Sequence, residues 1–293
     1  MLMLTYDPKW EGTFVYDEFA QQERVVKPLP WDDAAEFRWR TVNEIDKTKL
    51  RAWLRVRHIS IGSNTEMGNI LDAVASEQVI HPVREYFDHL KWDGVSRLNT
   101  WLPEYCEANR QPKKYLAEVG ACMFKASVKR IYKAGTPFHH MPVFEGGQAA
   151  GKSSMLKTLC MFGGVSYFTD RLSFTQLNDP YLPVRLQGVL FAEFQEMTGF
   201  SQKDRNLVKQ WLTMENDEIL PKFSNSLRVL PRQFIAVGTT NETTWMNDPT
   251  GGRRFWPISV GKINVAGLSM VSEQLWAEAI ARVKNGEGHY IDL

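Results

Sequence analysis

The chain contains 293 residues, of which 43% are hydrophobic and 24% are charged, as is usual for a globular protein. Its formal net charge of +1 argues against a broadly basic surface, so any contact with DNA has to come from a local patch. No apolar run approaches the ~18 residues that span a membrane, and the N-terminus lacks the pattern of a signal peptide. Cys106, Cys122 and Cys160 are scattered, odd in number and without CxxC spacing. This pattern indicates a reducing compartment and argues against a zinc site. We therefore expect a cytoplasmic protein with no membrane partner.

The first part of the chain, residues 1–136, is expected to be a mainly helical region. Pro28-Leu29-Pro30-Trp31 is typical of a boundary, and apolar residues recur at helical spacing over residues 32–80. His81-Pro82 starts a further helical segment, because proline is well placed in a first helical turn. A helix is predicted over residues 114–133, with an apolar face formed by Leu116, Val119, Met123, Phe124, Val128 and Ile131.

From residue 137 onward the pattern changes, and strands alternate with helices. The predicted strands are 141–145, 165–168, 187–194 and 233–238, and the predicted helices are 152–162, 203–213 and 270–284. Such alternation favours a mostly parallel sheet whose strands are joined by helical crossovers. The sequence therefore predicts an α/β core over residues 137–293.

Residues 146–153, Gly-Gly-Gln-Ala-Ala-Gly-Lys-Ser, match the phosphate-loop pattern G-x-x-x-x-G-K-[ST] at every fixed position. An apolar strand pattern precedes them and a helix-forming run follows, which favours a phosphate loop over a chance glycine-rich turn. Small residues let backbone N–H groups wrap phosphates, Lys152 can reach the β- and γ-phosphates, and Ser153 can bind Mg²⁺. The residues expected to bind a nucleoside triphosphate are Gly146, Gly147, Gln148, Ala149, Ala150, Gly151, Lys152, Ser153 and Ser154.

A second apolar strand, residues 189–193, ends in Glu193. A carboxylate at this point can hold the Mg²⁺ shell or polarise the attacking water, and Glu196 can share this work. The alternative is that an acid at the end of a buried strand only caps the next helix. The upstream phosphate loop favours catalytic roles for both glutamates and metal binding by Ser153 and Glu193, and the division of roles between the glutamates stays open.

Two further polar features follow in order. The apolar run 234–238 leads to Asn241, whose amide can orient water or sense the γ-phosphate, although asparagine is also a common turn residue. Arg253 and Arg254 follow a glycine-rich turn, and a guanidinium fork is the usual arginine finger. A surface pair neutralised by nearby acids is the alternative. Asn241, Arg253 and Arg254 follow the phosphate loop and the acidic strand in this order, which favours catalytic roles for these three residues together with Lys152 of the loop.

This order of motifs resembles the virulence-associated protein E family of phage- and plasmid-borne ATPases, which is related to superfamily 3 helicases. The segments that carry the resemblance are Tyr16 to Phe19, Pro28 to Trp31, His81 to Tyr86, Leu90 to Gly94, Arg97-Leu98, the Trp101 region, Glu193 to Glu196, Pro231-Arg232, Thr239 to Asn241, Asp248 to Pro257 and Glu273 to Ala279. The Arg253-Arg254-Phe-Trp-Pro257 stretch is the most specific of them. Two departures are visible. Family members often have Gly-x-Gly where this chain has Gln148-Ala149-Ala150, and Gln195 stands where an Asp is frequent.

The resemblance implies a P-loop NTPase core of AAA+-like, superfamily 3 helicase type, with ATP and Mg²⁺ as cofactors. It implies a DNA helicase or translocase of phage or mobile-element replication that acts on single-stranded or forked DNA. It also implies a homo-oligomeric ring whose arginines reach the nucleotide of the neighbouring subunit, and a primase of the same replicon as a partner. The alternative is a DNA-binding replication initiator or interference factor that uses ATP only as an assembly switch. A small-molecule kinase would explain neither Asn241 nor the arginine pair.

Residues 219–232 contain strand formers on both sides of Ser224-Asn225-Ser226 and predict a β-hairpin. The resemblance places a DNA-gripping hairpin at this point, so Lys222 and Arg228 are candidates for phosphate contacts and Phe223 for stacking on a base. A plain surface hairpin is an equally supported alternative.

Two other clusters receive ordinary interpretations. Lys125, Lys129 and Lys133 recur at helical spacing beside Arg130 and are interpreted as a solvated basic face, with DNA contact as the alternative. His139-His140 has no third spaced ligand, which favours a turn over a metal site.

Overall fold

The structure, a computed structural model, describes residues 2–195, 197, 201–220, 227–241, 245 and 252–291. The chain divides into two compact units, Met1–Glu85 and Tyr86–Leu293, and the division falls within helix α4 (Pro82–His89). The boundary predicted from the sequence was at residue 136 instead. Residues 86–136 belong to the second unit because their long helix α6 (Lys113–Tyr132) packs against α10 (Val265–Lys284) and β12 (Ile235–Thr240).

The first unit contains a small sheet that the sequence analysis did not predict. Its strand order is β3-β2-β1-β4, with antiparallel pairs except for the parallel pair of β1 and β4. The elements of this unit are α1 (Leu2–Tyr6), β1 (Phe14–Asp17), β2 (Gln22–Val25), β3 (Arg40–Thr41), α2 (Glu44–Arg55), α3 (Asn64–Ala75) and β4 (Val79–Ile80). Such short strands leave too few residues for a period-two pattern to be recognised.

Helices α2 and α3 lie within the segment that was expected to be helical, and both contribute to the core of the first unit. The core side chains include Leu4, Trp10, Phe14, Val25, Leu50, Leu54, Met67 and Leu71. Helix α2 begins after Asn43, whose side chain accepts hydrogen bonds from two backbone N–H groups of the first turn. The buried carboxylate of Asp46 completes this cap and pairs with Arg40.

The second unit is built on a five-stranded parallel sheet of order β13-β5-β12-β9-β8. Its other strands are β5 (Met141–Glu145), β8 (Phe168–Leu172), β9 (Phe191–Phe194) and β13 (Phe255–Ser259). The prediction of a mixed α/β core with a parallel sheet is confirmed. Strand β13 was not predicted, because Pro257 interrupts its apolar run; proline is tolerated there because β13 is an edge strand.

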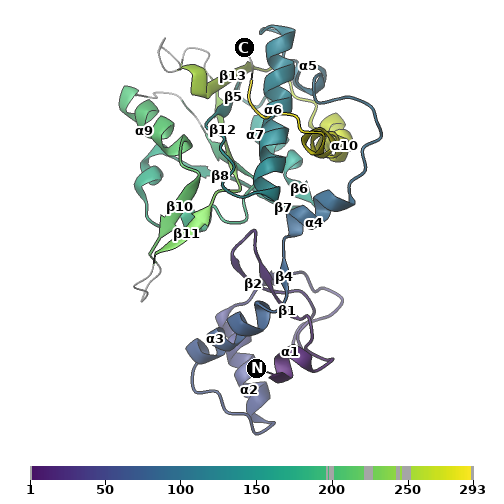
Figure 1. Cartoon of the computed structure of the whole chain (residues 1–293), viewed down its shortest axis with the longest axis vertical. Helices are drawn as coiled ribbons and strands as arrows, with labels where there is room; N and C mark the ends of the chain where they lie inside the picture. The colour runs from purple at the N-terminus through teal and green to yellow at the C-terminus, as the bar shows by residue number, and fades with distance from the viewer. Residues whose placement is uncertain are drawn as a thin grey trace. The chain divides into compact units, whose positions relative to one another are not determined.

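Helices cover both faces of this sheet (Figure 1). Phe194 of β9 contacts Trp211 of α9 (Gln202–Leu212), with ring centroids 5.6 Å apart. Phe191 of the same strand contacts Trp276 of α10, with centroids 6.0 Å apart. Residues an odd number of positions apart on a strand point to opposite faces, so α9 and α10 lie on opposite sides. The sheet is therefore the middle layer of three.

Shorter elements connect these layers. They are α5 (Trp101–Cys106), α7 (Lys152–Leu159), β6 (Met161–Phe162), β7 (Val165–Ser166), η1 (Phe174–Asn178), α8 (Leu182–Arg185), β10 (Asn216–Ile219), β11 (Arg228–Pro231) and η2 (Gly252–Arg254). The predicted hairpin is present, since β10 and β11 pair antiparallel from Asn216↔Pro231 to Ile219↔Arg228. Arg232, which is 2% exposed, anchors the base of this hairpin through two hydrogen bonds to Asp217, of 2.9 and 2.6 Å.

Helix α6 lies largely in the interior of the second unit, and two of the basic residues in its stripe are buried. The Lys125 side chain is 11% exposed and pairs with Glu287 at 3.1 Å. The buried Arg130 guanidinium donates to the carbonyl oxygens of Thr136 and Phe138. The interpretation as a basic surface was wrong for Lys125 and Arg130, because α10 and the sheet cover that part of the helix, whereas Lys129 is half-buried and Lys133 is exposed. Within the described part of the chain, neither this helix nor any other is long and apolar enough to cross a membrane.

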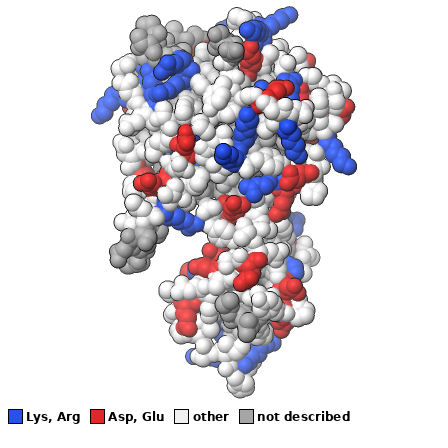
Figure 2. Space-filling view, viewed as in Figure 1, with Lys and Arg blue, Asp and Glu red and all other residues white. Residues whose placement is uncertain are grey.

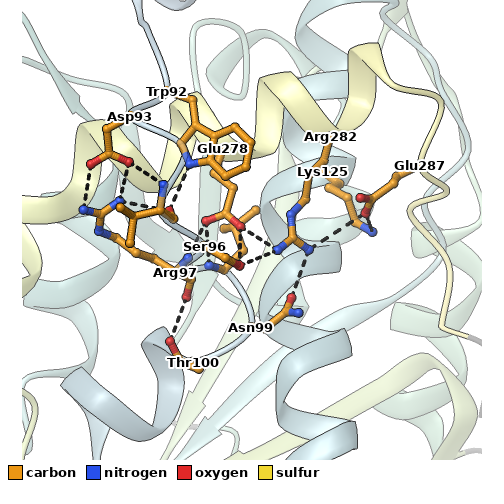
Figure 3. Close-up of polar contacts among 12 residues, drawn as sticks. Trp92, Asp93, Ser96, Arg97, Asn99, Thr100, Lys125, Glu278, Arg282 and Glu287 are labelled. Atoms are coloured by element: carbon orange, nitrogen blue, oxygen red, sulfur yellow. Dashed lines mark hydrogen bonds and ion pairs between the residues drawn. The ribbon is translucent and has the colours of Figure 1, made fainter.

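A polar cluster fixes the loop before α5 onto α10 (Figure 3). The fully buried Glu278 carboxylate accepts hydrogen bonds from the backbone N–H groups of Arg97 and Leu98, at 2.6 and 2.9 Å. It also accepts from the Ser96 hydroxyl at 2.9 Å and from Arg282 at 2.5 Å. Two of the segments that carried the family resemblance, around residues 90–101 and 273–279, are therefore joined in space.

Candidate functional site

The predicted phosphate loop connects β5 to α7 and adopts a tight conformation. Gly151 has φ +96°, in the left-handed region that favours glycine, and Ala149 has φ +59° although it carries a Cβ. At Gly146 a Cβ would lie 2.8 Å from the carbonyl oxygen of Val260, so glycine is required by close packing. The loop ends at the N-terminus of α7, where backbone N–H groups and the helix dipole favour an anion.

The Lys152 ammonium lies against the loop that precedes it. Its Nζ atom donates to the carbonyl oxygens of Gly146 and Gly147, at 2.7 and 2.9 Å, and to Asn241 Oδ1 at 3.1 Å. Burial lowers the pKa of Lys152 below its ordinary value, and the nearby Glu193 carboxylate opposes this shift. The lysine and the amide of Asn241 thus face the same point from two elements far apart in the sequence.

Glu193 is the next-to-last residue of β9 and is fully buried. Its Oε1 atom accepts hydrogen bonds from the Ser153 hydroxyl at 2.7 Å and from the Thr239 hydroxyl at 2.6 Å. Its Oε2 atom has no hydrogen-bond partner among the residues that the structure describes. A buried carboxylate oxygen without a partner, next to a serine hydroxyl at a helix N-terminus, fits the oxygen ligands that Mg²⁺ prefers.

These groups surround a pocket of about 440 Å³ at the carboxyl ends of the sheet strands. It is lined by Ala149, Ala150, Gly151, Lys152, Ser153, Ser154, Gln195, Thr239, Thr240 and Asn241. Strands β5, β12 and β9 are parallel neighbours, so the segments that follow them meet at the carboxyl ends of the strands. In open α/β sheets ligands bind at these carboxyl ends.

The two arginines lie at the opposite end of the strands, where β13 and β5 begin. Strand β13 runs parallel to β5 with Phe255 beside Met141 and Ser259 beside Glu145. Arg253 and Arg254 directly precede Phe255, so Arg254 is about six strand residues, roughly 20 Å along the strands, from the start of the phosphate loop at Gly146. Arg254 donates to the carbonyl oxygen of Lys209 at 3.0 Å, and Arg253 is exposed. The fold does not bring the arginine pair into the pocket.

Several other predicted site residues lie outside the described residues, namely Glu196, Lys222 and Phe223, as does most of the glycine-rich turn before Arg253. Arg228 begins β11 and is exposed. Gln148, Gly146 and Gly147 belong to the loop, although they are not among the side chains that line the pocket.

Sequence reasoning missed two contributors to the site. Thr239 was noted within the Thr-Thr-Asn motif but not as a partner of Glu193; the parallel pairing of β12 with β9 brings the two together. Glu145 directly precedes the loop, is buried, and accepts hydrogen bonds from the Trp245 indole at 2.6 Å and the Ser259 hydroxyl at 3.1 Å. An acid at the end of an apolar strand was the available signal for Glu145.

Fold and pocket together define a mixed α/β protein with a polar site at the carboxyl edge of a parallel sheet. A sequence model of the virulence-associated protein E-like domain matches residues 87–292. The chain belongs to this family. The match includes the whole sheet and both pocket-forming strands, β9 and β12.

Comparison with curated proteins finds no match to this sequence. Among solved structures, an apo A form of the NrS-1 C-terminal region is 14% identical, with a TM-score of 0.47, over 91% of this chain and 65% of that one. A second apo structure of the NrS-1 C-terminal region is also 14% identical, with a TM-score of 0.45, over 94% of this chain and 72% of that one. This chain thus spans less than two thirds of the first of these structures.

Proposed function

We propose that the second unit is a P-loop NTPase core of AAA+-like, superfamily 3 helicase type, which hydrolyses ATP to drive a DNA helicase or translocase. The observation that carries this proposal is the meeting of Lys152, Ser153 and Asn241 at one pocket, with the buried Glu193 carboxylate hydrogen-bonded to Ser153 behind it. A loop of backbone N–H groups, a buried lysine and a buried carboxylate are the groups that phosphoryl transfer to water requires.

Each side chain has a distinct role in the proposed reaction. Lys152 exchanges its bonds to Gly146 and Gly147 for the β- and γ-phosphate oxygens. Ser153 and Glu193 are the residues that would hold Mg²⁺, which would neutralise charge on the phosphates. The oxygen of the attacking water bonds to the γ-phosphorus while Glu193 accepts a proton from that water, and the bond between the γ-phosphorus and the bridging oxygen breaks to leave ADP and phosphate. Asn241 orients the water or the γ-phosphate.

The arginine pair supports a ring of identical subunits. Arg253 and Arg254 precede β13 and so lie at the amino-terminal ends of the strands, away from the pocket. They therefore act on the nucleotide of a neighbouring subunit rather than on the nucleotide of their own subunit. In a closed ring, head-to-tail contacts place one edge of each subunit against the opposite edge of the next. The same geometry makes nucleotide turnover depend on assembly.

The family resemblance supports DNA as the partner. Lys and Arg side chains are interspersed with Asp and Glu on the face shown in Figure 2, and the net charge is only +1. The DNA contact is therefore assigned to a short segment, the β10–β11 hairpin, which carries the exposed Arg228 and the predicted contacts Lys222 and Phe223. A primase of the same replicon is a further proposed partner.

ATP turnover with and without single-stranded DNA tests this function. We expect the wild-type protein to hydrolyse ATP faster when DNA is present, and Lys152→Ala to lose turnover because the only lysine of the loop is removed. Lys114→Ala, which removes a 75% exposed lysine of α6, is the matched control and should be unaffected. Turnover that DNA does not change would favour the ATP-switched initiator instead, and full turnover by folded Lys152→Ala would overturn the phosphate-loop assignment.

A further inference from the structure

A second pocket, of about 550 Å³, lies between α7 and α10 and shares Ser154 with the phosphate pocket. Its volume is within the ~300–1,000 Å³ of sites that hold small molecules. Ser154 lines both pockets. The second pocket is otherwise lined mainly by Tyr86, Lys157, Met161, Met270, Glu273 and Trp276. The two pockets therefore follow one another across the first turn of α7.

The position of this pocket agrees with the direction in which a bound nucleotide would run. Lys152 and Asn241 mark the γ-phosphate end of the phosphate pocket, because the lysine contacts the β- and γ-phosphates. Ser154 lies on the far side of Lys152 along α7, and Lys157 and Thr158 follow it one turn later. A nucleotide bound in this direction would pass its sugar and base beyond Ser154 into the space between α7 and α10.

The lining of the second pocket suits a nucleobase. The Tyr86 ring stacks on Phe162 with centroids 4.9 Å apart, and Met161 and Met270 are apolar side chains exposed by 39% and 86%. The lining also carries several polar side chains, and among them Glu273 Oε1 accepts a hydrogen bond from the Tyr86 hydroxyl at 2.5 Å. The tyrosine holds one carboxylate oxygen, so the other oxygen can accept a hydrogen bond from a ligand.

The helix that carries Glu273 is held at a fixed distance from α7. The Trp276 indole N–H donates to the carbonyl oxygen of Leu159, at the end of α7, at 2.9 Å. Further along α10, Glu278 and Arg282 form hydrogen bonds with Ser96 and Asn99 of the loop before α5, as Figure 3 shows. The walls of the pocket are therefore preorganised, which reduces the entropy cost of ordering a ligand.

We propose that this pocket binds the ribose and the base of the nucleotide, and that Glu273 selects adenine by accepting a hydrogen bond from its amino group. This proposal rests on the proposed nucleotide site. A carboxylate oxygen accepts hydrogen bonds and donates none, so it favours the amino group of adenine and disfavours the carbonyl oxygen that replaces it in inosine.

The test compares the binding of ATP, ITP and tripolyphosphate to the full chain by calorimetry in the presence of Mg²⁺. The wild-type protein should bind ATP at least about tenfold more tightly than either other ligand; tenfold corresponds to about 1.4 kcal/mol. Glu273→Gln should bring the ATP and ITP affinities to within about twofold of one another, because an amide also donates to a carbonyl. Tripolyphosphate binding should not change in this variant. Tyr86→Phe, which frees the carboxylate, should lower the discrimination partially.

Glu104→Gln, which neutralises an exposed carboxylate of α5 outside the pocket, is the matched control and should behave as wild type. Equal affinities of the wild-type protein for ATP and tripolyphosphate would overturn the base pocket while leaving the phosphate site intact. An unchanged ATP preference in Glu273→Gln would also overturn it. Failure of the wild-type protein to bind any of the three ligands, or binding that Lys152→Ala does not weaken, would instead overturn the nucleotide site and the base pocket with it.

Discussion

The hydroxyl of Ser153 donates to Glu193 Oε1 at 2.7 Å and so connects the first turn of α7 to the end of β9. Helix α7 follows β5, and β5 is not adjacent to β9 in the sheet, because β12 lies between them. Thr239 of β12 donates to the same oxygen at 2.6 Å. These contacts therefore join three elements, α7, β9 and β12. They bring the proposed metal-binding and proton-accepting groups to one point.

Glu193→Gln should retain ATP binding but lower turnover by a factor on the order of 10² or more, the scale of removing a general base. The amide keeps the shape and the acceptor oxygen that Ser153 and Thr239 use, so the pocket should stay folded. Single-turnover hydrolysis together with ATP affinity measures the two effects separately. Glu196→Gln is the comparison: if it stalls hydrolysis and Glu193→Gln does not, the roles of the two glutamates are reversed.

Replacement of Arg253 and Arg254 by Ala should leave nucleotide affinity nearly intact and lower turnover steeply, since an arginine finger contributes roughly 10³–10⁵ in rate. Because both arginines lie at the amino edge of the sheet, the effect should act between subunits. Mixing the double-alanine protein with Lys152→Ala should restore partial turnover, since mixed interfaces combine one intact loop with one intact arginine donor. Zero turnover at every mixing ratio, with co-assembly demonstrated, would mean that the arginines act within their own subunit or are only structural.

Glycine substitutions at Ala149 and Ala150 should have opposite effects on stability. Ala149 has φ +59°, a left-handed conformation that costs a residue with a Cβ roughly 1–2 kcal/mol, whereas Ala150 is outside this region. Ala149→Gly should raise the free energy of unfolding by roughly 0.5 kcal/mol, after the larger entropy of an unfolded glycine is subtracted. Ala150→Gly should lower it by a similar amount. Urea unfolding without nucleotide measures both, and the same sign at the two positions would contradict the loop conformation.

Acid should destabilise the protein partly through His140. Burial lowers the pKa of His140 to about 4, with contributions from the charges of His139 and Arg254. Its ring stacks on Trp256, with centroids 4.3 Å apart. Because the unfolded chain binds the proton near pH 6.5 and the folded chain only near pH 4, stability is lost as the pH falls through this window. His140→Phe keeps the stack and removes the titration, so its unfolding free energy should fall less steeply between pH 6.5 and 4. Parallel profiles for the two proteins would refute this assignment.

Much of the second unit could be predicted from the sequence, because its signals are local. The spacing from Gly146 to Ser153 specifies a loop between a strand and a helix, and the apolar runs at β5, β9 and β12 have lengths typical of buried strands. The β10–β11 hairpin was found in the same way. The small sheet of the first unit and the edge strand β13 were missed, because very short strands and Pro257 conceal the period-two pattern.

The sequence by itself determined the types of chemical group that the protein can use: a phosphate loop with Lys152, an acid at Glu193, and an amide at Asn241. Only the tertiary structure decided how these groups meet. The parallel order of β5, β12 and β9 brings their carboxyl ends to one edge, and Thr239 becomes a partner of Glu193 for that reason. It also decided that the arginine pair, although it follows in the same motif order, lies at the opposite edge, since strand pairing places residues by register rather than by their separation in sequence.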